Sequence, residues 1–136
     1  MTSHEAEIKA LLNERVDATR AKHIDRLMAL YAPTIVYFDV VPPTQFVGPV
    51  EVRRNYLRWF DEYEGPIGLE THALRVATSE DVAFAHMLHS VSGKRRSGVP
   101  QGQARVRSTV CCRRSGGTWS ITHEHVSLPL GGRNDA

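Results

Sequence analysis

The sequence predicts one α+β domain, with helices first and a run of antiparallel strands after them. Two observations carry this prediction. Apolar residues recur with helical spacing in three segments before residue 66, and from residue 69 onwards the chain is rich in strand-forming residues. The length of 136 residues, with 41% hydrophobic residues, fits a single domain that buries a core of its own.

Three helices are predicted in the first half of the chain. Residues 3–21 carry apolar side chains at i, i+3 and i+4, which is typical of an amphipathic helix. The same spacing continues over residues 24–31 and stops at Pro33, whose ring removes a backbone donor and restricts the residue before it. Gly48-Pro49 marks the start of the third helix, which is expected to end near Gly65-Pro66.

Strands are predicted where β-branched and aromatic residues gather between turn residues. Ile35–Asp39 is the first, and the two prolines of VPPTQ end it because they cannot continue a ladder. The others span residues 69–77, 82–92, 103–114 and 118–128, separated by the turn compositions SED, GKRRSG and SGG. The resulting order, ααβαββββ, predicts a curved antiparallel sheet with the helices packed against its concave side.

Charge and composition argue against several classes of function. Lys and Arg outnumber Asp and Glu by only 17 to 15, and the basic residues are scattered, so no nucleic-acid-binding stripe is predicted. No apolar run approaches the roughly eighteen residues of a membrane span, and the polar N-terminus lacks the apolar segment of a signal peptide. We therefore expect a cytoplasmic protein that binds neither nucleic acid nor membrane.

The adjacent Cys111 and Cys112 point to opposite faces of a strand and are interpreted as packing residues.

The last predicted strand places two histidines in line with two core residues. Side chains two apart share one face of a strand, so Trp119, Ile121, His123 and His125 form one row. If the apolar members of this row face the core, both imidazoles face it too. The row is therefore predicted to continue from the core into the polar floor of a pocket.

Four segments of the chain resemble the nuclear-transport-factor-2-like superfamily, in its SnoaL-like and ketosteroid-isomerase-like branch. They are LMALYAP, IVYFD, FVGPVEVRRNYLRWF and WSITHEHVSLP. The resemblance covers roughly residues 5–129 of a single domain, 1–136, whose tail, 130–136, is expected to be flexible. It implies a cone-shaped α+β barrel with an internal pocket, usually paired into a homodimer. Members include isomerases, cyclases, dehydratases, epoxide hydrolases and non-catalytic binding or assembly modules, so the fold alone does not fix the function.

Asp39 is the first candidate catalytic residue. The resemblance places it where ketosteroid isomerases and SnoaL-type cyclases carry a carboxylate that moves protons at carbon. A carboxylate at the end of an apolar strand is suited to that task. The alternative is that Asp39 caps the VPPTQ loop through backbone hydrogen bonds, which Asp often does before a turn.

Side chains from neighbouring strands are expected beside Asp39. The resemblance places His86 inside the cone, and an inward row at Trp119 brings part of ARVRSTV to the cavity as well. The predicted catalytic residues are Asp39, His86, His123, His125 and Arg107. The predicted ligand-binding residues are Tyr31, Tyr37, Phe46, Trp59, Phe60, Arg105 and Thr109.

The chain departs from ketosteroid isomerases at two positions. Those enzymes stabilise an enolate with a Tyr from the first helix and with a carboxylic acid that stays neutral in an apolar site. Arg15 stands approximately where that Tyr would be, and Thr109 where that acid would be. The steroid oxyanion hole is therefore missing, and a specific steroid isomerase is not expected. An inward Arg107 would pair with Asp39 or bind a substrate carboxylate or enolate.

Three functions are compatible with these residues. The first is a cofactor-independent lyase, isomerase or cyclase acting on a small, largely apolar carbonyl or ring compound. In it Asp39 is the base, a pocket histidine is the acid or orienter, and Arg107 binds the developing oxyanion. The second is a non-catalytic ligand-binding or assembly module. The third is a metal-assisted hydrolase or dehydratase, in which His86 or Asp39 joins the two histidines of the last strand.

A homodimer is predicted from the face of the sheet opposite the pocket. If the row of Trp119 points inward, its neighbours on two adjacent strands form an apolar patch on the outside. These outward residues are Val106, Val110, Cys112, Val126 and Leu128. A patch of this kind is larger than a monomer usually exposes to water, so we expect a second copy to cover it.

Overall fold

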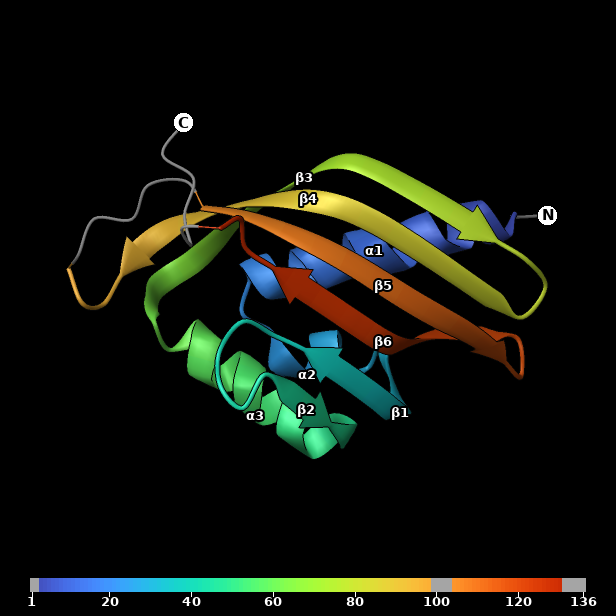
Figure 1. Ribbon diagram of the computed structural model, residues 1–136, viewed down its shortest axis with the longest axis horizontal. Helices are drawn as coiled ribbons and strands as arrows, with labels where there is room; N and C mark the ends of the chain where they lie inside the picture. Colours follow the sequence, from blue (N-terminus) through green and yellow to red (C-terminus); the bar gives the residue numbers. More distant parts are fainter. Residues whose placement is uncertain (1–2, 99–103, 131–136) are drawn as a thin grey trace.

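The described residues, 3–98 and 104–130 of a computed structural model, form helices and strands in the order ααββαββββ (Figure 1). The helices are α1 (His4–Arg20), α2 (Ile24–Met28) and α3 (Gly48–Phe60). The strands are β1 (Tyr31–Phe38), β2 (Gln45–Val47), β3 (Tyr63–Thr78), β4 (Val82–Arg95), β5 (Ala104–Ser115) and β6 (Thr118–Ser127). The predicted α+β class is confirmed.

The first and third helices begin close to where the sequence predicts. The Oγ of Ser3 caps α1 by accepting a hydrogen bond from the backbone N–H of Ala6 at 3.1 Å. Pro49 lies in the first turn of α3, where its missing N–H removes no helical bond. The predicted end of α3 near Gly65 was wrong, because the chain has already entered β3 at Tyr63, which pairs with Arg95 of β4.

The region between the first and third helices holds more strand than predicted. α2 ends at Met28 and β1 begins at Tyr31, so Pro33 lies inside a strand. The register between β1 and β6 shifts between Tyr31 and Val36, and Pro33 falls within this shift, where its missing N–H interrupts no regular ladder. The three residues of β2 were not predicted, since so short a segment shows no alternation.

The strands form one curved sheet in the order β2-β1-β6-β5-β4-β3. Neighbouring strands are antiparallel except for β1 and β6, which are parallel. The prediction of an antiparallel sheet was therefore wrong for the pair β1 and β6 and correct for the other pairs. The sheet curves without closing into a barrel, with β2 and β3 as its edges. α1 packs against β3 and β6, and α3 packs against β1, β2 and β3, so these helices cover the concave face (Figure 1).

A β-bulge at Thr122 reverses the alternation of β6. Cys112 pairs with Ile121, whereas the preceding residue, Cys111, pairs with His123, so Thr122 is one extra residue in β6. Trp119 and Ile121 face the core before the bulge, and Glu124 faces it afterwards, fully buried. His123 and His125 therefore point to the convex face. Their predicted inward orientation was wrong because a strict period of two does not survive an extra residue.

The neighbouring strands also show the reverse of the predicted orientation. On β4, Ala85, Met87 and His89 are buried, while His86 is exposed. On β5, Arg105, Arg107 and Thr109 are exposed and alternate with inward-facing residues. The predicted apolar patch on the outer face was therefore also wrong. Its residues on β5 alternate with the exposed ones and face inward, and its remaining residues follow the bulge in β6 and face inward too. Val106, Val110, Cys112, Val126 and Leu128 all belong to the hydrophobic core or to the wall of the cavity described below.

Leu130 is exposed, and the remainder of the predicted flexible tail, like the predicted strand start at Gln103, lies outside the described residues. Among the described helices, none is long and apolar enough to cross a membrane. The cytoplasmic location stays a prediction.

Deleting Thr122 is expected to leave the protein folded. Without the extra residue, regular alternation from Ile121 still places His123 on the convex face and Glu124 in the core. Thr122→Ala is the matched control, because it keeps the number of residues and removes only a hydroxyl that donates to Cys111 O at 3.3 Å. Urea unfolding followed by circular dichroism measures both variants. A deletion variant that no longer unfolds cooperatively, beside a folded Thr122→Ala, would contradict the assignment.

Candidate functional site

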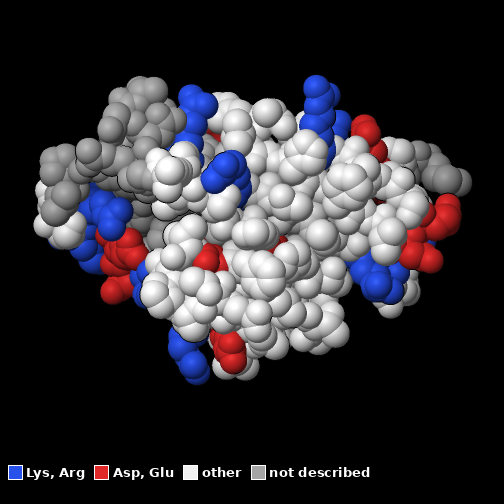
Figure 2. Space-filling model, in the orientation of Figure 1, with Lys and Arg blue, Asp and Glu red and all other residues white. Residues whose placement is uncertain are grey.

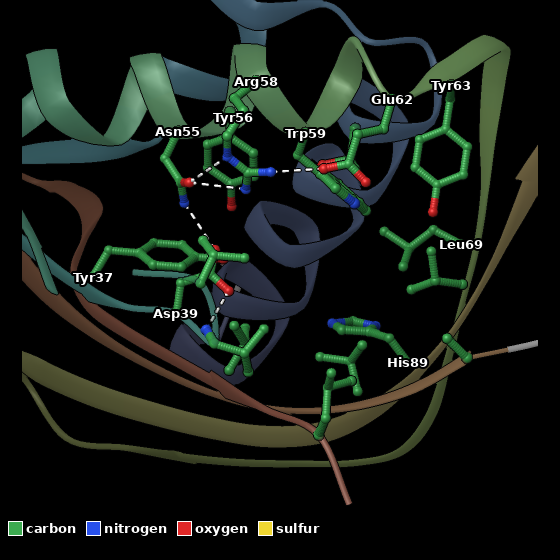
Figure 3. Close-up of a pocket in the computed structure, with 18 of the residues that line it drawn as sticks. Tyr37, Asp39, Asn55, Tyr56, Arg58, Trp59, Glu62, Tyr63, Leu69 and His89 are labelled. Carbon is green, nitrogen blue, oxygen red and sulfur yellow. Dashed lines mark hydrogen bonds and ion pairs between the residues drawn. The ribbon is translucent and has the colours of Figure 1, made fainter. Parts of the chain in front are cut away.

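A cavity of about 290 Å³ lies between the concave face of the sheet, α1 and α3. Figure 3 shows Asp39 and His89 on the sheet side of this cavity and Asn55, Tyr56 and Trp59 on the side of α3. Much of the wall is apolar, with contributions from Trp59, Leu69, Val91, Val106, Val126 and Leu128. The polar and charged side chains that reach it include Arg15, Asp39, Asn55, Arg58, His89 and Arg95.

A buried ion pair lies at the inner end of this cavity. Arg15 projects from α1 and Glu124 from β6, and the two side chains are 6% and 0% exposed. The guanidinium binds the carboxylate with two nitrogens: Nε donates to Oε1 at 3.3 Å, and Nη2 donates to Oε2. Such a fork-shaped pairing is the geometry that best offsets the cost of removing both charges from water.

Two tyrosines complete the hydrogen bonding of Glu124. The hydroxyl of Tyr31 donates to Oε1 of Glu124 at 2.6 Å and lies 2.6 Å from the hydroxyl of Tyr56. Burial, followed by the nearby negative charge of Glu124, raises the pKa of both phenols and of Tyr37. The three phenols therefore stay protonated and act as hydrogen-bond donors.

His89 is held neutral beside Arg15. Burial lowers the pKa of His89 to about 3, and the positive charge of Arg15 contributes in the same direction. Its Nε2 lies 3.4 Å from Nη1 of Arg15, and since a guanidinium is only a donor, Nε2 is the acceptor. The other ring nitrogen, Nδ1, lies 3.2 Å from the hydroxyl of Thr71. His89 is therefore an orienting group, and its accepting nitrogen has no proton to give to a ligand.

Arg15 remains charged and has donors to spare. Burial alone would lower its pKa, but the combined effect of Glu124, Tyr56 and Tyr31 places that pKa well above its ordinary value. Three of the five N–H donors of a guanidinium are used in the bonds to Glu124 and His89. The remaining donors belong to a side chain that lines the cavity. They can bind an oxygen atom of a ligand.

Asp39 carries one of the two carboxylates on the wall of the cavity. It directly follows β1 and is half-buried. Its Oδ2 accepts a hydrogen bond from Nδ2 of Asn55 at 2.8 Å, and its Oδ1 accepts one from the backbone N–H of Val40 at 2.6 Å (Figure 3). Asp39 thus caps the start of the following loop, as one interpretation predicts, and also faces the cavity, as the other requires. Asn55 fixes the direction of the carboxylate.

The cavity includes only part of the predicted site. Asp39, Tyr37 and Trp59 line it, while Tyr31 and Phe60 are buried in the core and Phe46 packs against the core at the edge of the sheet. The remaining candidates lie on the convex face or point away from the cavity. They are His86, Arg105, Arg107, Thr109, His123 and His125.

Specific contacts hold several of these outer residues in place. Nδ1 of His123 lies 2.7 Å from Val36 O, and the rings of His123 and His125 pack edge-on against Phe38. Nη2 of Arg107 donates to Leu128 O at 2.8 Å. Within residues 3–98 and 104–130, no three His, Cys, Asp or Glu side chains are grouped so that they could hold a metal ion. The described structure therefore offers no support for the metal-assisted hypothesis.

The site residues that were not predicted include Arg15, Asn55, His89 and Glu124, and on the cavity wall also Arg58, Glu62 and Arg95. Arg15 carries a detectable signal, because it occupies a position on the apolar stripe of α1 that begins with Ile8. A charged residue on a core-facing stripe predicts a buried partner of opposite charge. Nothing in the local pattern marks Glu124 as that partner, since its burial depends on the bulge before it.

Comparison with known proteins shows the family to which the chain belongs. Residues 8–131 match the model of the SnoaL-like domain. The chain belongs to the SnoaL-like domain family. This match confirms the predicted superfamily. A search of curated proteins found no match to the chain.

Solved structures of SnoaL-like and related folds agree with this assignment. An NTF2-like protein of unknown function from Pseudomonas putida KT2440 is 32% identical, with a TM-score of 0.82, over 95% of this chain and 90% of that one. A ketosteroid isomerase-like protein from Erwinia carotovora atroseptica SCRI1043 is 22% identical, with a TM-score of 0.79, over 94% and 98%. A putative dehydratase of the NTF2-like family from Streptomyces avermitilis is 18% identical, with a TM-score of 0.78, over 91% and 94%. The last two likenesses show the fold.

Removing one member of the buried ion pair should destabilise the protein strongly. Glu124→Ala leaves the charge of Arg15 buried without its partner, and we expect a loss of about 3–5 kcal/mol in the free energy of unfolding. The double variant Arg15→Met/Glu124→Leu removes both charges and should recover a large part of that loss. Urea unfolding measures both effects.

The surface pair of Arg53 and Asp25 provides the control for this measurement. These side chains are 43% and 75% exposed, so Arg53→Ala should change the free energy of unfolding by at most about 1 kcal/mol. An equally small effect of Glu124→Ala would show that the buried pair does not stabilise the fold.

Proposed function

We propose that this SnoaL-like domain catalyses cofactor-independent proton transfer at carbon on a small, largely apolar ring or carbonyl compound. The observation that carries the proposal is that one largely apolar cavity is lined both by the carboxylate of Asp39 and by the buried guanidinium of Arg15. A base and an oxyanion-binding donor are the two groups that removal of a proton beside a carbonyl requires.

The roles follow from the hydrogen bonds of each group. The carbonyl oxygen of the substrate accepts from Arg15, and Asp39 takes a proton from the adjacent carbon. The electron pair of the broken C–H bond moves into an enolate, whose oxygen stays bound to the guanidinium. The enolate is then reprotonated by Asp39 at another carbon, which completes an isomerisation, or it expels a leaving group, which completes an elimination.

Other side chains support this chemistry without taking part in it. Asn55 orients Asp39, and His89 and Glu124 orient Arg15. The apolar wall around Trp59 limits the access of water, which strengthens hydrogen bonds formed inside the cavity. His86, His123, His125 and Arg107 have no role in this proposal, because they lie outside the cavity.

Binding without chemistry is the second candidate function. The observation that favours it is that the inner polar groups hold one another, since Arg15 pairs with Glu124 and His89 is neutral with its accepting nitrogen occupied. Such a site recognises a ligand oxygen, and both carboxylates on its wall, Asp39 and Glu62, already accept hydrogen bonds from neighbouring side chains.

Asp39→Asn should abolish proton exchange while leaving ligand affinity largely intact. We would incubate the protein with 2-tetralone in D₂O and follow deuterium incorporation beside the carbonyl by mass spectrometry. Loss of the base should reduce the enzyme-dependent rate by ~10²–10⁴-fold. Asp81→Asn, in the exposed turn between β3 and β4, is the matched control.

The outcomes of this experiment separate the two candidate functions. Exchange that persists in Asp39→Asn would refute the role of Asp39 as base. Binding of the ketone by the wild type without any exchange would support the binding module instead.

We further propose that the domain forms a homodimer through the convex face of the sheet. The centre of this face is nearly free of Lys, Arg, Asp and Glu, which lie mainly towards its edges (Figure 2). Phe84 is 51% exposed there, and His86, His123 and His125 lie on the same face. A sheet face whose centre is nearly free of charge and carries aromatic rings suits burial against a second copy of itself.

Phe84→Glu should convert the dimer to a monomer. The substitution places a charge in the centre of the proposed interface, where it would be buried against a second copy. Val50→Glu is the control, because Val50 is 69% exposed on α3, away from the sheet. Sedimentation velocity measures the mass of each protein. A wild-type monomer, or a dimer that Phe84→Glu leaves unchanged, would contradict this interface.

A further inference from the structure

Two arginines share one carboxylate at the wall of the cavity. Arg58 comes from α3 and Arg95 from the end of β4, and both line the cavity together with Glu62. Nη1 of Arg58 donates to Oε2 of Glu62 at 2.7 Å, and Nη2 of Arg95 donates to Oε1 at 3.0 Å. Because one negative charge faces two positive charges, this cluster carries a net positive charge.

Arg95 is the member of the cluster with the most free hydrogen-bond donors. Arg58 uses three of its five N–H donors, since Nε and Nη2 donate to Oδ1 of Asn55 and Nη1 to Glu62. Arg95 uses one nitrogen in its bond to Glu62, and its guanidinium carbon lies 5.8 Å from the centre of the Tyr63 ring. Its side chain is 33% exposed, so the remaining donors are accessible from the cavity and from solvent.

The neighbouring acidic groups already have partners. Asp61 pairs with Arg96 and Glu64 with Lys94. Asp39, the other carboxylate on the cavity wall, accepts from Asn55 and Val40. Among the described residues that line the cavity, Arg95 is therefore the cation with most unused donors.

We propose that the ligand of this cavity carries a carboxylate, which binds Arg95 while the ring of the ligand occupies the apolar wall. The inference rests on the proposed function and names its substrate class: a cyclic or aromatic keto acid with one carboxylate. A guanidinium held in a fixed plane suits a carboxylate, because two parallel N–H donors match the two oxygens. Glu62 and Tyr63 hold Arg95 in such a fixed position.

The test compares two compounds that differ only in charge. We would measure the binding of 3-oxocyclohexanecarboxylate and of 3-oxocyclohexanecarboxamide by isothermal titration calorimetry. The wild type should bind the acid about tenfold more tightly than the amide, since a charge-assisted pair replaces a neutral one. Arg95→Gln should remove this preference and leave the affinity for the amide unchanged.

Arg96→Gln is the matched control. Arg96 is the next residue, but it pairs with Asp61 at the surface and does not line the cavity, so the preference for the acid should persist. Arg95→Lys, which keeps the charge and loses the planar fork, should retain only part of the preference. Thermal unfolding of each variant verifies that it is folded.

Several outcomes would overturn the proposal. The wild type could bind the acid and the amide equally tightly, or bind neither compound. Arg95→Gln and Arg96→Gln could also lose the preference for the acid to the same extent. Failure of the proposed function has a different readout, because Asp39 is tested by deuterium exchange into the ring of either compound. An acid preference that depends on Arg95, without exchange that depends on Asp39, would leave a carboxylate-binding module.

Discussion

The pairing of Arg15 with Glu124 constrains the positions of five elements around the cavity. Two charges buried in a protein interior are tolerated only when their geometry and remaining hydrogen bonds are satisfied. Here α1 and β6 supply the charges, β1 and α3 supply the tyrosine hydroxyls, and β4 supplies the neutral histidine. A displacement of any one of these elements would leave a polar group unpaired, so the pair fixes how the helices sit on the sheet and where the inner end of the cavity lies.

The arrangement divides the cavity into regions of different chemistry. The inner end presents a guanidinium whose charge is balanced by its own carboxylate, and the wall presents Asp39, which is held by Asn55. The cluster around Glu62 adds a positive charge elsewhere on the wall. Between them lies mostly apolar surface, so a ligand gains from ring burial and is oriented by a few polar contacts.

Local patterns were sufficient to predict most elements and insufficient to predict the site. Helical spacing and caps are encoded within a few residues, and α1 was predicted to within one residue at each end. Asp39 was predicted correctly at the cavity because the segment before it alternates without interruption. The histidines and Arg107 were placed on the wrong face, because the side on which a strand packs depends on partners far away in the sequence and, in β6, on one extra residue.

The bulge at Thr122 has a consequence for how such domains diverge. Gain or loss of a single residue in a regular strand exchanges the side chains beyond it between the two faces of the sheet, whereas a bulge absorbs one extra residue and leaves those faces unchanged. A one-codon insertion or deletion at this position can therefore change the length of the last strand while the pocket and the outer face keep their side chains. Relatives whose last strands differ in length by one residue should be aligned at the bulge before their pocket residues are compared.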